Sequence, residues 1–155
     1  MKDMRENLVS SRVTMFQVLL LHSRADRALR LIVAKQLERF NITMMEWLLI
    51  GSVCRGPKQG MTMTDVATKL DVTLPQVTAL ITNLTKNKLL RQKISSLDRR
   101  SRRLIITSVG RKLLDSIDHD LENVLKLWVR DIPTDRWQAY LNVVEVFANQ
   151  KLGNG

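Results

Sequence analysis

The 155-residue sequence predicts a mainly α-helical protein with one small β-hairpin. Apolar residues recur every three or four positions over most of the chain, which is the spacing of one face of a helix. Two segments, residues 89–94 and 102–107, lack this spacing and contain β-branched residues, as strands do. The residues between them, 95–98, are predicted to form the turn of a hairpin.

Local signals place the first two helices. A long helix is predicted over residues 12–40, which contain neither proline nor glycine. Thr43 is followed three residues later by Glu46, which is the pattern of a capping box, so a second helix is expected over residues 44–54. That segment is apolar almost all round, and helices of this kind are normally buried on several sides.

Two short helices joined by a tight turn are expected next. Thr62 and Asp65 form a second capping box, which opens a helix over residues 63–70. After a two-residue turn, Thr73 is expected to cap a helix that runs to about Asn87. Two capped helices joined so closely are a helix-turn-helix candidate.

The C-terminal third of the chain returns to helical spacing. A long helix is expected from Gly110 onward until Pro133 breaks it. Thr134 is then expected to cap a last amphipathic helix. Long apolar stripes therefore lie at both ends of the chain.

The positive charge is concentrated in one short segment. The chain carries 25 basic and 15 acidic residues, a net charge of +10. Residues 86–112 alone carry +9, with Asp98 as the single acid, and the rest of the chain carries +1. Such concentration favours a surface that binds a polyanion over a simple solvated charge run.

Several classes of protein are excluded by what the sequence lacks. A single cysteine, Cys54, excludes an intramolecular disulfide, and no apolar stretch approaches the roughly 18 residues of a membrane span, so a cytoplasmic protein is expected. No motif of a phosphate-binding loop, a zinc hydrolase or a nucleophile elbow occurs, so neither an enzyme nor a cofactor is predicted. His22 and His119 are isolated, which argues against a metal site.

The helix from Thr73 has one apolar face and one polar face. Val77, Ile81 and Leu84 define the side that is expected to face inward. The opposite side, with Asn83 on it and Gln76 at its flank, carries hydroxyls, amides and a cation but no carboxylate, and the whole stretch 73–97 lacks acids. A reader of the DNA major groove needs such donors and acceptors without groups that repel phosphate. An ordinary surface helix is the alternative.

The hairpin supplies a second candidate contact. Arg99, Arg100, Arg102 and Arg103 flank its tip, and arginines on such a tip suit the negative potential of a narrow minor groove. Asp98 is expected to pair with and orient one of these arginines, although a simple turn aspartate is the alternative.

Two sequence stretches resemble the MarR (multiple antibiotic resistance regulator) family of transcription factors. They are "TLPQVTALITNLTKNKLL" (residues 73–90), similar to the family's recognition helix, and "DRRSRRLIITSVGR" (residues 98–111), similar to its wing. The resemblance implies a winged helix-turn-helix DNA-binding lobe over residues 43–112. It also implies a helical dimerisation lobe built from residues 1–42 and 113–155, and hence a homodimer.

The resemblance also implies individual DNA contacts. Asp98 and Arg100 match the wing pair, so Arg100 is expected in the minor groove. The predicted DNA-binding residues are Thr73, Gln76, Thr78, Ala79, Thr82, Lys86, Asp98, Arg99, Arg100 and Arg102. Ala79 and Asn83 depart from the family, which often has arginine at these positions. Asp71 replaces a turn glycine, but aspartate tolerates positive φ better than most residues, so the turn is expected to be kept.

Relatives of this kind commonly bind a small aromatic or phenolic effector between the two lobes. The residues expected to line such a site are His22, Met45 and Trp47, with residues near Leu113 to Ile117, and the alternative is that they pack in the core. Cys54 is expected to be an inert buried thiol.

The leading hypothesis is a homodimeric, sequence-specific regulator that binds double-stranded DNA. It would be a repressor relieved by an effector. The alternatives are a low-specificity DNA- or RNA-binding module without an effector, and an enzyme or cofactor-dependent protein.

Overall fold

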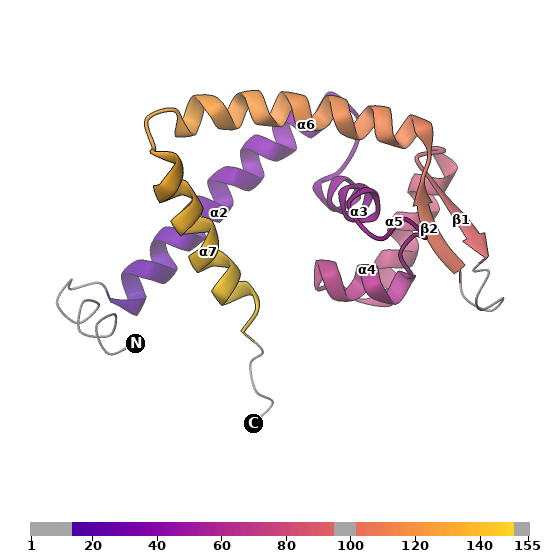
Figure 1. Ribbon diagram of the computed structural model, residues 1–155, viewed down its shortest axis with the longest axis horizontal. Coiled ribbons are helices and arrows are strands. Elements are labelled where there is room, and N and C mark those ends of the chain that lie inside the picture. Colours follow the sequence, from indigo (N-terminus) through magenta and orange to yellow (C-terminus); the bar gives the residue numbers. More distant parts are fainter. Residues whose placement is uncertain (1–13, 95–101, 151–155) are drawn as a thin grey trace. The chain divides into compact units, whose positions relative to one another are not determined.

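The computed structural model describes residues 14–94 and 102–150 (Figure 1). The predicted fold class, helices with one hairpin, is confirmed. The described elements are α2 (Met15–Glu38), α3 (Met44–Cys54), α4 (Met63–Leu70), α5 (Leu74–Lys86), β1 (Leu90–Ile94), β2 (Arg102–Ile106), α6 (Ser108–Val129) and α7 (Thr134–Ala148).

The chain divides into two compact units. The first, Met1–Asp118, holds α2 to α5, the hairpin and the first part of α6, and the second, His119–Gly155, holds the rest of α6 and α7. The division into lobes that the resemblance implies stays a prediction. Among the described residues, no helix is both long and apolar enough to cross a membrane.

The predicted capping boxes set the starts of α3 and α4. The Thr43 hydroxyl accepts from the backbone N–H of Glu46, and the Glu46 carboxylate accepts in return from the backbone N–H of Thr43. Thr62 and Asp65 form the same pair at α4. The prediction that Thr134 caps α7 is wrong, because Pro133 is extended and takes the cap position, which makes Thr134 the first helical residue.

The core of the first unit is built around α3, which packs against α2, α4, α5 and β2. In Figure 1 this helix lies between α4 and the first part of α6. Buried apolar side chains come from every element of the unit, in agreement with the sequence prediction for α3. The most deeply buried are Leu37, Leu49, Ile50, Val66, Val77, Ile81, Leu84, Leu90, Leu104, Leu114 and Ile117.

The turn between α4 and α5 needs a residue with positive φ. Asp71 ends α4 in the left-handed conformation, with φ 52° and ψ 52°. Aspartate tolerates this region better than most residues, so the turn is kept without glycine. The backbone N–H of Val72 then donates to the Ala67 carbonyl at 3.0 Å, which closes the helix end.

The hairpin is anchored to the rest of the first unit through one edge of β2. β1 and β2 pair antiparallel from Leu90 with Ile106 to Ile94 with Arg102. Met61 bridges Leu104 on the other edge of β2. Gly60, with φ 89°, precedes this bridge, and a Cβ there would lie 2.6 Å from the Leu104 carbonyl oxygen.

The second unit is largely exposed. No residue of α7 is buried, and its aromatic rings Trp137 and Tyr140 stack with centroids 5.4 Å apart. Large exposed apolar side chains occur here and along α2 of the first unit. They include Met15, Phe16, Leu19, Leu21, Leu31, Leu127, Trp128, Val143, Val146 and Phe147.

Candidate nucleic-acid interface

The polar side of α5 is exposed, and it forms the core of the candidate site. Val77, Ile81 and Leu84 are almost fully buried, which fixes the opposite side of the helix toward solvent. We call this side the α5 exposed face. It comprises Thr73, Gln76, Thr78, Ala79, Thr82 and Lys86, all six of them exposed. It carries no carboxylate, so nothing on it repels a phosphate backbone.

Hydrogen bonds within α5 decide which polar atoms of this face are available. The hydroxyls of Thr78 and Thr82 donate at 2.9 Å to the carbonyls of Leu74 and Thr78, so their oxygens remain as acceptors. The Gln76 side-chain oxygen accepts at 2.9 Å from both the backbone N–H and the hydroxyl of Thr73. This leaves the two N–H groups of the Gln76 amide, which have no partner among the described residues, as donors at the helix start.

Asn83, which the sequence predicts on the same polar side of the helix, uses its side-chain amide for a contact within the protein. Its side-chain amide donates to the carboxylate of Glu46 on α3. Glu46 is only 5% exposed and also accepts at 2.8 Å from the backbone N–H and the hydroxyl of Thr43. The amide of Asn83 is therefore engaged in holding α5 against α3.

The carboxylate of Glu46 is held in its charged form. Burial acts to raise its pKa, but the hydrogen bonds from Thr43 and Asn83 together outweigh burial, so the pKa of Glu46 lies below its ordinary value. A charged acceptor makes these bonds stronger than bonds between neutral groups. Sequence reasoning found Glu46 only as a cap and missed its partner on α5, 37 residues away.

The hairpin follows directly on α5 and packs against it through β1. Arg102 is exposed at the first position of β2, and Arg91 and Lys93 are exposed on β1. Arg103 has a structural role instead, because its guanidinium donates at 2.9 Å to the Gly60 carbonyl. The predicted contacts Asp98, Arg99 and Arg100 lie outside the described residues.

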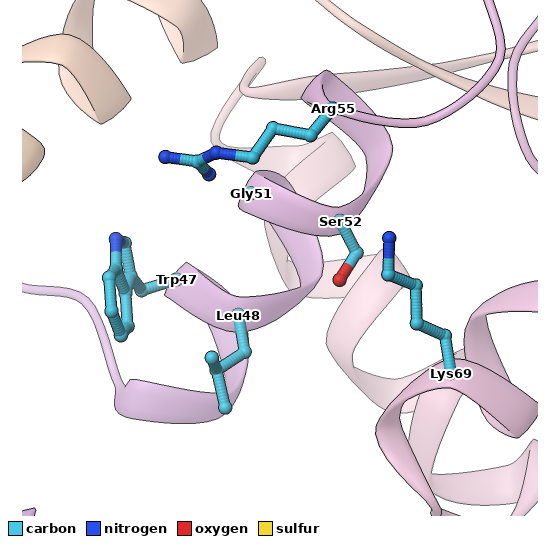
Figure 2. Close-up of a pocket in the computed structure, with 6 residues that line it drawn as sticks. All are labelled: Trp47, Leu48, Gly51, Ser52, Arg55 and Lys69. Carbon is cyan, nitrogen blue, oxygen red and sulfur yellow. The ribbon is translucent and has the colours of Figure 1, made fainter. Parts of the chain in front are cut away.

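The residues proposed to bind an effector are only partly brought together. Met45 and Trp47 are half-buried on α3, and His22 is half-buried on α2, with its Nδ1 atom 3.1 Å from the Val18 carbonyl oxygen. Trp47 lines a pocket of about 330 Å³ between α3 and α4, which we call the α3 pocket; His22 and Met45 do not. Figure 2 shows its lining, formed by Trp47, Leu48, Gly51, Ser52, Arg55 and Lys69.

Cys54 is half-buried rather than buried as expected. The guanidinium of Arg111 donates to its sulfur at 3.1 Å. Among the described residues, no group of three or more histidine, cysteine, aspartate or glutamate side chains is placed to hold a metal ion.

Comparisons with known proteins agree with this fold. Residues 40–101 match the model of the MarR family. No curated protein matches the sequence. Several solved structures share the fold at low sequence identity.

CouR from Rhodococcus jostii RHA1, solved with p-coumaroyl-CoA bound, has a TM-score of 0.80 at 18% identity, covering 92% of this chain and 99% of that one. The DNA complex of Staphylococcus aureus MepR has a TM-score of 0.73 at 21% identity, covering 90% and 100%. BldR from Sulfolobus solfataricus has a TM-score of 0.72 at 21% identity, covering 84% and 94%. The likeness therefore extends over nearly the whole chain and shows a common fold.

Proposed function

We propose that this chain is a transcription regulator that binds specific sequences of double-stranded DNA, because residues 40–101 match the model of the MarR family. The α5 exposed face carries the proposal. It is a helix surface of acceptors, an amide and one cation without a carboxylate, placed beside a basic hairpin. MepR, which shares the fold, was solved in complex with DNA, and this supports the same use of the fold here.

The side chains of this face divide into two roles. Gln76, Thr78, Ala79 and Thr82 present an amide, two hydroxyl acceptors and a methyl group, which suit base edges in the major groove. Thr73 and Lys86 lie at the two ends of the helix, where phosphate contacts that position a reading helix are made. The role of Asn83 is to hold the helix, not to read bases.

The hairpin is proposed to enter the adjacent minor groove. Arg102 would make this contact together with Arg99 and Arg100, and Asp98 would orient one of the arginines. Arg103 is left out of the contact set because its guanidinium is bound to the Gly60 carbonyl.

We propose that the protein acts as a homodimer. Exposed apolar side chains extend along α2 and α7, for example Leu31 at 67% and Val146 at 58% exposure. Each of the two helices therefore exposes several large apolar side chains, and exposed apolar surface is typical of an interface. A two-fold dimer would place its recognition helices about one turn of DNA, roughly 34 Å, apart.

The finer proposal is a cytoplasmic repressor whose DNA binding is relieved by a small aromatic or phenolic effector. The α3 pocket supports this, because its volume of about 330 Å³ falls within the range of small-molecule sites and one aromatic side chain, Trp47, lines it. CouR, which shares the fold, was solved with an aromatic CoA ester bound.

The test is DNA affinity measured against both sequence and salt. A duplex from the region upstream of the protein's own coding sequence is compared with random duplex over a salt series. The proposal predicts a ratio of affinities of about 10³ or more at physiological salt. A ratio near unity with a steep salt dependence would instead indicate a low-specificity module that contacts only phosphates.

A further inference from the structure

The first turns of α5 expose apolar groups that the folded chain does not bury. Among the described residues of α4 and α5, Leu74 is the one large apolar side chain that is exposed, at 47%. Thr78 follows it by four residues and Thr82 by eight, so the three lie along one side of the helix. Together with two exposed neighbours they form a surface of methyl and methylene groups. We call this surface the α5 methyl patch; it comprises Leu74, Pro75, Thr78, Ala79 and Thr82, all exposed.

The two threonines of the patch offer a methyl group and an acceptor to an outside partner, but no donor. Their hydroxyl hydrogens are donated at 2.9 Å to the carbonyls of Leu74 and Thr78. Each hydroxyl oxygen keeps a lone pair for an N–H group outside the helix. In the major groove an A·T pair presents both the thymine methyl and the adenine N6 donor, whereas a G·C pair presents a donor but no methyl. The threonines therefore complement an A·T pair.

Gln76 is not able to make the usual two-point contact of a glutamine with adenine. The backbone N–H of Thr73 can only donate, so the atom 2.9 Å from it is the amide oxygen, which also accepts from the Thr73 hydroxyl. The contact with adenine N6 and N7 needs both the oxygen and the NH₂ group of the amide. With its oxygen engaged, Gln76 can only donate, and N7 accepts from it in either purine. Recognition of an A·T pair is left to the methyl patch.

The start of α5 also has no cation with which to bind guanine. The commonest specific contact with guanine is made by arginine or lysine to O6 and N7, and residues 73–85 contain neither. Lys86 follows Leu74 by a distance of roughly 18 Å along the helix, at a rise of about 1.5 Å per residue. Recognition helices contact bases mainly with their N-terminal residues, so Lys86 lies too far along α5 to take this role.

We propose that α5 recognises thymine through its C5 methyl group and that Leu74 makes this contact. One exposed leucine is ordinary on a protein surface, but this one adjoins four other apolar or methyl-bearing side chains on the helix that is proposed to enter the major groove. Contact removes both the methyl group and Leu74 from water, which is favourable. Cytosine has no methyl at this position and leaves Leu74 hydrated.

The inference rests on the proposed function and deepens it. It adds Leu74, which is absent from the predicted set of DNA-binding residues, as a residue that determines specificity. It also names the chemical group that is read, so each half-site is expected to carry an A·T pair where the first turns of α5 meet the groove.

The experiment begins by selecting bound sequences with the full-length protein from random duplexes long enough for two half-sites about 10 base pairs apart. In the enriched duplex each thymidine is then replaced in turn by deoxyuridine, which lacks only the methyl group. Affinity is measured by fluorescence anisotropy for the unmodified protein, for Leu74→Ala and for Val109→Ala as the matched control. Val109 is an exposed apolar side chain at the start of α6, outside the methyl patch.

The proposal predicts that deoxyuridine weakens binding about fourfold at one or more thymines of each half-site, which is the effect of losing one buried methyl group. In Leu74→Ala the same replacement should have almost no effect, because the partner of the methyl group is gone. Val109→Ala should keep the whole loss. Deoxyuridine tolerated at every position, or an undiminished loss in Leu74→Ala, would overturn the proposal. If Leu74→Ala does not fold, the scan with the unmodified protein still decides whether a methyl group is read.

A second replacement tests the methyl group apart from the hydrogen bonds of the base pair. At the thymine that is sensitive to deoxyuridine, the T·A pair is changed to C·G and then to 5-methylcytosine·G. The first change should weaken binding, and the added methyl group should recover about fourfold of the loss. No recovery would show that the position is read through hydrogen bonds and would refute the role of Leu74.

The selection also distinguishes failure of this inference from failure of the proposed function. An enriched sequence whose affinity does not depend on any thymine methyl leaves a sequence-specific regulator that reads other groups, and only the inference fails. If no sequence is enriched and binding to random duplexes falls steeply with salt, the protein contacts phosphates alone. The proposed function then fails, and the inference fails with it.

Discussion

Glu46 joins the start of α3 to α5, so Glu46→Gln is expected to cost more stability than the same change at an ordinary helix cap. Its carboxylate accepts from the backbone N–H and hydroxyl of Thr43 and from the amide of Asn83. Asp65→Asn is the matched control. Asp65 occupies the same position in the capping box of α4, is exposed, and accepts hydrogen bonds only within its own cap among the described residues.

The magnitude follows from counting these bonds. Loss of a capping interaction costs about 1 kcal/mol, which is the whole effect expected for Asp65→Asn. A hydrogen bond to a charged group contributes about 1.5–3 kcal/mol, and glutamine keeps the shape of Glu46 but loses its charge. Glu46→Gln is therefore expected to lower the free energy of unfolding by about 2–3 kcal/mol.

Urea unfolding measures both changes, at one fixed protein concentration because the apparent stability of the proposed dimer would depend on concentration. Adding Asn83→Ala and the double variant completes a cycle that isolates the bond between α3 and α5. If Glu46→Gln costs no more than Asp65→Asn, or if the cycle shows no coupling with Asn83, the account of how α5 is held is wrong.

The same carboxylate gives stability a defined dependence on pH. The pKa of Glu46 is lower in the folded state than its ordinary value, so its contribution is fully present above about pH 4.3 and is lost as the pH falls through the folded pKa. The loss of stability on acidification should therefore be shallower in Glu46→Gln than in the unmodified protein. Equal slopes would contradict the assignment of a charged, hydrogen-bonded Glu46.

Three further predictions follow from single contacts. Gly110→Ala places a Cβ 2.2 Å from the Leu89 carbonyl oxygen, which is backbone and cannot move away cheaply, so thermal or urea unfolding should show a loss of about 3 kcal/mol or more. Gln76→Ala should change the base preference across a panel of duplexes, and an equal loss on every sequence would make Gln76 a positioning residue. Leu31→Glu, on the exposed face of α2, should convert the proposed dimer to a folded monomer in analytical ultracentrifugation, and an unchanged oligomeric state would place the interface elsewhere.

The sequence predicted the elements well where their ends depend on local chemistry. Thr43 and Thr62 cap α3 and α4 as expected, because a capping box involves only residues three positions apart. The predicted cap of α7, Thr134, was wrong by one position. Pro133 takes the cap position with an extended backbone and makes no side-chain hydrogen bond to the helix start. The left-handed turn at Asp71 was anticipated from the tolerance of aspartate for positive φ.

The sequence predicted which side of α5 is exposed, but it did not predict the hydrogen bonds that join residues of the site to distant parts of the chain. Helical periodicity alone oriented α5, because Val77, Ile81 and Leu84 had to be buried. The bonds from Asn83 to Glu46 and from Arg103 to Gly60 join residues far apart in sequence, and no local pattern specifies such pairs. Of the residues that line the α3 pocket, the sequence predicted only Trp47, and no local pattern could join it to Lys69, which lies on another helix.

The most direct test of the central claim is amide hydrogen exchange with and without a duplex from the upstream region, at physiological salt. Protection is predicted over residues 73–86 and in the strands of the hairpin, with little change in α3, which is buried in both states. Protection confined to α7, or absent from α5 while DNA is bound, would contradict the assignment of the α5 exposed face as the DNA-binding surface.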